Sequence, residues 1–71
     1  MEMVVDGEKL RRLRLERFLD VGEVAEAAGL SPASIGRMEH GDWPGASRPS
    51  TVRKLAAALE VDPHELLVEE D

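Results

Sequence analysis

The sequence predicts an all-α domain, and three observations carry that prediction. Aromatic residues make up 3% of the chain, so a core of Leu, Val and Ala fits helix packing better than a sheet sandwich. Apolar residues recur at the helical spacing i, i+3, i+4 in several segments. All four prolines stand where a helix would begin or within a loop. These patterns predict five helices in one small domain.

The first helix is expected over about residues 7–18. Asp6 is placed to cap it, because an aspartate side chain accepts hydrogen bonds from the first free N–H groups of a helix. Leu10 and Leu13 form its apolar stripe, which we extend to Phe18.

The next two helices, about 21–28 and 32–39, form a helix-turn-helix. Gly29 ends the earlier helix as a left-handed cap, and the turn that follows is short. The helix starts are marked by Asp20 with Glu23 at capping-box spacing, and by Ser31 with Pro32. Such a unit commonly lays its second helix in the major groove of DNA.

A Gly- and Pro-rich loop is expected over 41–49 and a fourth helix over about 50–60. Asp62 and Glu65 form a second capping box around Pro63, which predicts a short fifth helix over about 63–68. The domain organisation we expect is a short N-terminal arm (1–6), the helix-turn-helix domain (7–68) and an acidic tail (69–71).

The net charge of −6 is unevenly distributed along the 71 residues. Residues 9–59 contain all nine basic residues against six acidic ones, whereas both ends of the chain are acidic. A mildly basic body permits contact with nucleic acid without demanding it. The acidic ends are expected to be solvated surface, and they could also weaken non-specific binding to DNA.

Several function classes are disfavoured. The chain has no cysteine, which excludes disulfides and thiolate metal sites, and neither His40 nor His64 has the neighbours of a metal site. No nucleophile, base and orienting acid stand at recognisable spacing, so we do not expect an enzyme. Apolar runs are too short to span a membrane and no secretory signal is evident, which favours a cytoplasmic protein.

Three stretches carry a resemblance to a known family: GEKLRRLRLER, EVAEAAGLSPASIGRMEHG and RPSTVRKLAAALEVDPHELL. The chain resembles the phage-repressor and Cro type of helix-turn-helix, also called the xenobiotic-response-element type, over about residues 7–68. The resemblance implies a five-helix lambda-repressor-like domain that binds double-stranded DNA without a cofactor. It further implies a sequence-specific transcriptional regulator, a repressor, whose homodimer places helix 32–39 of each copy in the major groove.

The resemblance also implies an ion pair between Arg14 and Glu39. In relatives, an arginine of the first helix and a glutamate that ends the recognition helix form a partly buried pair. Such a pair would lock the recognition helix against the first helix. The alternative is two separate surface charges.

The resemblance assigns a candidate DNA surface. It implies that the loop after the recognition helix touches the DNA backbone, and that the second helix starts where relatives usually hold a phosphate through glutamine. N–H groups at the starts of the second and third helices also suit phosphate oxygens. The resemblance assigns base-facing positions to Ser31, Pro32, Ala33, Ser34, Gly36 and Arg37, and phosphate-facing positions to Val21 and Arg48.

This surface departs from the family pattern, because Val21, Pro32, Ala33 and Gly36 offer little or no hydrogen-bonding side chain. Arg37 is then the residue able to read a base strongly, through the O6 and N7 atoms of guanine. The alternative for Arg37 is an ion pair with a local carboxylate.

The roles of two further residues, Gly36 and Trp43, remain open at this point. Gly36 costs about 1 kcal/mol inside a helix relative to Ala, and it indicates either close packing or a weak helix on the one hand, or close approach to DNA on the other. Trp43, in the loop, is expected to be a hydrophobic cover rather than a DNA contact.

A second function on the same fold is a protein-binding adaptor or antitoxin. The negative net charge and the scarcity of hydrogen-bonding side chains on the recognition helix favour it. As a DNA binder, the chain is expected to be a Cro-like standalone module. Its dimer contacts could come from the apolar stretches Leu66-Leu67-Val68 and Met3-Val4-Val5. Both stretches could equally pack on the domain's own core.

Overall fold

The computed structural model describes residues 3–43 and 47–68, and this part of the chain is helical with two isolated β-bridges. Four α-helices are followed by one 3-10 helix, η1. The expected acidic tail, the first two residues of the arm and residues 44–46 of the long loop lie outside the described residues. The elements are α1 (Gly7–Glu16), α2 (Val21–Ala28), α3 (Pro32–Glu39), α4 (Pro49–Leu59) and η1 (Pro63–Leu66).

The count of five helices is not confirmed, because the expected helix over 63–68 is one 3-10 turn, Pro63–Leu66. The backbone after this turn is extended and pairs with the N-terminal arm. The Asp6 N–H donates to the Leu66 carbonyl over 2.7 Å, and the Val68 N–H donates to the Val4 carbonyl over 2.9 Å. Those two bonds remove the helical alternative for the end of the segment.

The first helix is also shorter than expected, because it ends at Glu16. Phe18 follows in the left-handed region with φ of 54°, and its side chain is 93% exposed. The N–H groups of Phe18 and Leu19 turn back to the carbonyls of Leu15 and Arg14, which is the Schellman arrangement at a helix end. Phe18 therefore closes the helix and does not extend its apolar stripe.

The predicted caps are confirmed. Asp6 accepts hydrogen bonds from the N–H groups of Glu8 and Lys9. Both predicted capping boxes are formed in full, at the starts of α2 and η1. Gly29 ends α2 in the left-handed region with φ of 69°, so the corner between α2 and α3 uses the backbone freedom of glycine. These local signals fix where α2 and α3 begin and end.

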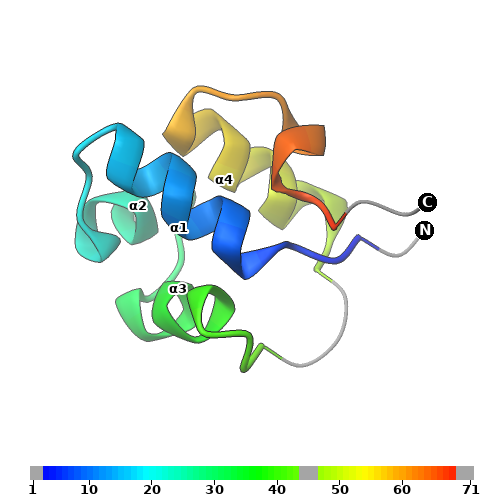
Figure 1. Cartoon of the computed structure of the whole chain (residues 1–71), viewed down its shortest axis with the longest axis horizontal. Helices are drawn as coiled ribbons and strands as arrows, with labels where there is room; N and C mark the ends of the chain where they lie inside the picture. The colour runs from blue at the N-terminus through cyan, green and yellow to red at the C-terminus, as the bar shows by residue number, and fades with distance from the viewer. Residues whose placement is uncertain (1–2, 44–46, 69–71) are drawn as a thin grey trace.

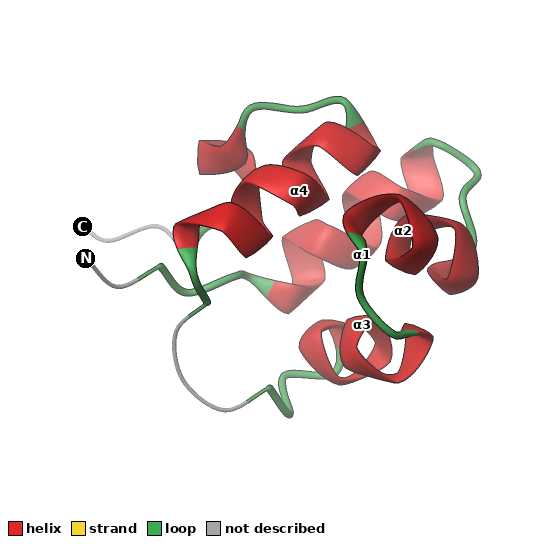
Figure 2. Ribbon diagram, turned by 180° about the vertical axis from the view of Figure 1, so that it is seen from behind, coloured by secondary structure: helices red, strands yellow, loops and turns green. Residues whose placement is uncertain are grey.

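The hydrophobic core lies between the four α-helices and η1. Helix α2 packs on both α3 and α4, and α1 packs on α3 and η1. Figures 1 and 2 show α3 at one edge of the bundle, with α4 on the opposite side of α1 and α2. The largest fully buried side chains are Leu10, Val24, Ile35, Val52, Leu55, Leu59 and Leu66.

The N-terminal arm lies between two other segments. Met3 pairs with Ser47 on one side, and Val5 pairs with Leu67 on the other. Figure 1 shows the arm and the segment after η1 side by side. Val5 packs against the core and Leu66 is fully buried, whereas Val4 and Val68 remain 48% and 47% exposed. Each stretch therefore divides its apolar residues between the domain's own core and the surface.

Within the described residues, no helix is long and apolar enough to cross a membrane.

Candidate nucleic-acid interface

Helix α3 has two different sides. Its inner side carries Ile35 and Met38, which are 0% and 3% exposed in the core. The side turned away from the core presents a set of residues that we call the outer face of α3. Its members are Ser31, Pro32, Ala33, Arg37 and His40, which are exposed, and Ser34 and Gly36, which are half-buried.

The start of α3 is free of acidic residues in its first turn. Ser31 caps the helix by accepting from the Ser34 N–H over 3.1 Å, and the two hydroxyl oxygens lie 2.9 Å apart. At the start of α2, in contrast, Asp20 accepts from the Glu23 N–H over 2.7 Å. A phosphate that approaches the start of α2 would therefore meet a carboxylate. At the start of α3, it would meet the hydroxyl groups of Ser31 and Ser34 and backbone N–H groups.

Val21 lies half-buried at the start of α2, where its side chain packs against the hydrophobic core. The structure thus gives this position a packing role, and a DNA contact here would have to come from the backbone.

Gly36 has open space beside it. A Cβ atom built on Gly36 would meet no heavy atom of the described residues within 4 Å, outside its own helix backbone and chain neighbours. Close packing inside the described part of the protein therefore does not explain this glycine. A weak helix and close approach to DNA both remain open, and the DNA contact stays a prediction.

Arg37 extends from α3 toward the loop. Its Nη2 donates to the Asp42 carbonyl over 3.3 Å, and its guanidinium carbon lies 5.5 Å from the centre of the Trp43 ring. Within residues 3–43 and 47–68, no carboxylate lies within ion-pair distance of Arg37, so the expected alternative of a carboxylate pair is not found. Trp43 is half-buried and packs against the core, as expected of a hydrophobic cover.

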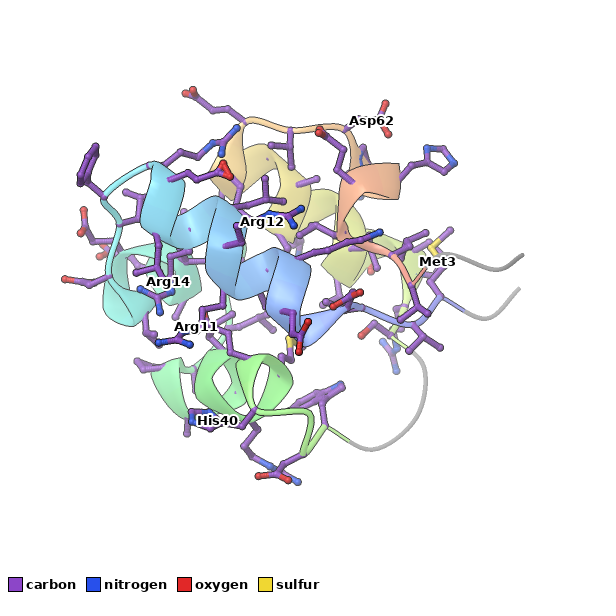
Figure 3. The ribbon with its side chains drawn as sticks, in the orientation of Figure 1. Met3, Arg11, Arg12, Arg14, His40 and Asp62 are labelled. Carbon is purple, nitrogen blue, oxygen red and sulfur yellow. The ribbon has the colours of Figure 1, made fainter. Side chains whose placement is uncertain are left out.

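Arg14 and Glu39 form the ion pair that the resemblance implies. Arg14 Nε donates to Glu39 Oε2 over 2.7 Å, and Nη2 donates to Oε1 over 2.9 Å. The two side chains are 12% and 4% exposed. Figure 3 shows Arg14 on the side of α1 where α3 lies. This two-point contact fixes the end of α3 against α1.

A third N–H group of Arg14 also has a partner, since Nη1 donates to the Leu19 carbonyl over 2.9 Å. Hydrogen bonding to Glu39 raises the pKa of Arg14 above its ordinary value, and burial opposes that change. The negative charges of Glu39 and Asp20 act in the same direction as the hydrogen bond. Glu39, the acidic residue of α3, is thus turned inward, and its negative charge is balanced by Arg14. The outer face therefore has no carboxylate from its own helix.

Gly7 makes a second close contact between α1 and α3. A Cβ atom at Gly7 would overlap the Met38 carbonyl oxygen and lie 3.1 Å from the Glu39 carbonyl oxygen. Only glycine lets the start of α1 come this close to the end of α3. Position 7 and the ion pair together set the place of α3 in the domain.

Arg48 belongs to a different element from the outer face of α3. It is the exposed N-cap residue of α4, next to Ser47, which pairs with the arm. The structure brings Ser31, Pro32, Ala33, Ser34, Gly36 and Arg37 onto one face of α3. The phosphate contact expected of Arg48 stays a prediction.

His40 is a member of the outer face that the sequence reasoning set aside as an ordinary surface residue. Its Nδ1 lies 2.7 Å from the Gly36 carbonyl oxygen, and Figure 3 shows the side chain on the side of α3 turned away from α1. The sequence feature that could have identified His40 is its position four residues after Gly36, because residues four apart lie on one helix face. In the described part of the chain, no group of His, Asp and Glu side chains is arranged to hold a metal ion.

Comparison with known proteins agrees with this geometry. The family model described as helix-turn-helix domain matches residues 7–67. The chain belongs to the helix-turn-helix domain family. The HTH-type transcriptional repressor RghR of Bacillus subtilis (strain 168) is 47% identical over 62 residues, which are 87% of this chain and 44% of RghR. The chain thus spans less than half the length of this curated relative.

Solved structures of helix-turn-helix proteins share the fold. The restriction-modification controller protein C.AhdI from Aeromonas hydrophila superposes with a TM-score of 0.77 at 32% identity, over 87% of this chain and 91% of C.AhdI. The P22 c2 repressor, solved with a synthetic operator, has a TM-score of 0.76 at 21% identity, over 87% of this chain and 92% of its own. The latter likeness confirms the phage-repressor resemblance at the level of the fold.

Proposed function

We propose that this domain binds double-stranded DNA as a sequence-specific transcriptional regulator, a repressor, with α3 in the major groove. The observation that carries the proposal is the outer face of α3. It is open to solvent, its helix contributes no outward carboxylate, and it contains a guanidinium with no carboxylate partner among the described residues. Similarity to the repressor RghR and to the controller C.AhdI supports this assignment.

Base reading on this face depends mainly on Arg37. Arginine binds guanine through two parallel hydrogen bonds to O6 and N7, the commonest base-specific contact in the major groove. Ser34 and the methyl group of Ala33 add smaller contributions, because a hydroxyl can bond to several bases and a methyl can contact thymine. The proposal therefore predicts one guanine contact per half-site.

Two copies of the domain would bind two half-sites related by two-fold symmetry. Val4 and Val68, exposed and joined by a backbone hydrogen bond, support a homodimer contact at the chain ends. A Cro-like mode of action, a cytoplasmic location and the absence of enzymatic activity belong to the same proposal. The regulators among the relatives support it.

Replacement of Arg37 by Ala tests the proposal directly. The variant should bind an operator selected from random DNA more weakly by about 1–3 kcal/mol, because the guanine contact is lost. Discrimination at that guanine should fall with it, measured by mobility shift on the operator and on a base-substituted copy. Arg53→Ala is the matched control, since it removes an equally exposed positive charge from α4. Equal operator affinity of wild type and Arg37→Ala would exclude this role.

The second candidate function is a protein-binding adaptor or antitoxin, favoured by the net charge of −6 and by the scarcity of hydrogen-bonding side chains on the outer face. A salt titration against random duplex separates the two functions. A DNA binder should bind at low ionic strength and release as salt rises, because counterions are displaced from phosphates. Failure to bind any duplex at low ionic strength would favour the adaptor.

A further inference from the structure

The guanidinium of Arg37 has a defined place in the protein before any ligand is bound. Its carbon lies 5.5 Å from the centre of the Trp43 ring, which is within the distance of a cation–π contact. One N–H group, on Nη2, is directed at the Asp42 carbonyl over 3.3 Å. Both partners come from the segment that follows α3, so the loop supports the side chain of the helix.

This support leaves the reading groups of Arg37 available. A contact with an aromatic ring uses the electrostatic attraction of the ring face, whereas base recognition uses N–H groups at the edge of the guanidinium plane. The carbonyl of Asp42 takes one of the five N–H groups. Four N–H groups therefore have no partner among the described residues, which is enough for two bonds to guanine.

Trp43 is itself anchored. The ring is half-buried and packs against the hydrophobic core, so it provides a firm surface instead of a mobile one. An arginine on an exposed helix face loses side-chain freedom when it binds, and a preformed contact reduces that loss. Since Pro32, Ala33 and Gly36 supply no hydrogen-bonding side chain, the position of one guanidinium decides most of the specificity.

We propose that Trp43 is a positioning residue that orients Arg37 for reading a base, and that the loop after α3 thereby sets the DNA specificity of this domain. This inference rests on the proposed function. It differs from the role expected of the ring from sequence, which was to cover the core. Trp43 does both, because it packs against the core and the guanidinium carbon of Arg37 lies over its ring, 5.5 Å from the ring centre.

The test uses two substitutions at one position. Trp43→Leu keeps an apolar cover and removes the aromatic face, whereas Trp43→Phe keeps an aromatic face. Trp43→Leu should weaken binding to the selected operator about two- to fivefold and reduce discrimination at the Arg37-dependent base pair. Affinity for random duplex should not change, and Trp43→Phe should restore most of the discrimination. A merely structural ring would change both affinities together.

A double-mutant cycle with Arg37→Ala completes the test. If Trp43 acts through Arg37, Trp43→Leu should have no further effect on operator affinity once Arg37 is absent. If the two effects add, the inference is overturned while DNA binding stands. If the wild-type protein binds neither operator nor random duplex, the proposed function itself fails. These outcomes separate the two claims.

An NMR measurement on the free wild-type protein tests the inference without any variant. Ring current from Trp43 should move the side-chain NMR signals of Arg37 away from those of the exposed Arg53. Signals of Arg37 that match those of Arg53 would overturn the inference without any mutation.

Discussion

The two sides of α3 are built in opposite ways. The inner side is fixed to α1 by a buried ion pair, Arg14 with Glu39, and by the close backbone contact at Gly7. The outer face has open space at Gly36 and a single guanidinium that is held by the loop. One side of the same helix specifies where it lies, and the other side leaves room for a ligand.

This difference shows how a small domain can support a recognition surface. The core of a chain of 71 residues is limited, so each specific contact between elements is a large part of its stability. The ion pair and the close approach at Gly7 are two such contacts, and both join α1 to α3. The outer face can then have few side chains of its own, because the placement of α3 does not depend on them.

Replacement of Glu39 by Ala should have the largest effect. The substitution leaves the guanidinium of Arg14 buried without its carboxylate, so we expect a loss of about 3 kcal/mol or more in the free energy of unfolding. Chemical denaturation measures this loss. A loss below about 0.5 kcal/mol would contradict a buried role for the pair.

Glu16→Ala is the control for that experiment. It removes the partner of Arg12 in an ion pair with an N–O distance of 3.9 Å, between side chains that are 65% and 53% exposed. Exposed pairs of this kind contribute about 0–1 kcal/mol, because solvent screens them. The two glutamates thus compare the same chemistry in buried and exposed surroundings.

The elements of the fold could be predicted wherever local signals act alone. Asp20 with Glu23, Gly29 and Ser31 with Pro32 mark the ends of α2 and α3, and the structure places those ends as expected. Prediction failed at the end of α1, where Phe18 closes the helix in the left-handed region, and at η1, where distant segments intervene. The last helix is cut short because residues 66–68 pair with the arm, and no local pattern in the sequence reports that pairing.

The candidate site shows the same division. The residues of α3 could be assigned to an outer face, because helical spacing places them there. The partners of Arg37 could not be assigned, since Asp42 and Trp43 lie beyond the end of α3, where helical spacing no longer places residues. Arg48 was assigned to the site by family resemblance alone. The structure shows it as the N-cap residue of α4, and its phosphate contact stays a prediction.

Gly7→Ala tests the backbone contact on the inner side. Ala has the higher helix propensity, but its Cβ would overlap the Met38 carbonyl oxygen, and backbone atoms cannot rotate away as a flexible side chain can. We therefore expect destabilisation of about 1–3 kcal/mol in chemical denaturation, typical of overpacking. A stabilised variant would mean that α1 and α3 separate easily, and that the ion pair alone fixes α3.

Gly36→Ala is the smallest change and should have the opposite sign. A Cβ at Gly36 meets nothing within 4 Å among the described residues, so the variant should gain up to about 1 kcal/mol from its higher helix propensity. On the proposed function, the new methyl group would meet the DNA. Operator affinity should therefore fall while the free energy of unfolding rises, measured by mobility shift and by chemical denaturation on the same preparation. A loss of stability would mean that Gly36 is packed within the protein. Unchanged affinity would mean that Gly36 does not approach the DNA closely. The residues at the start of α3 and Arg37 would then make the base contacts.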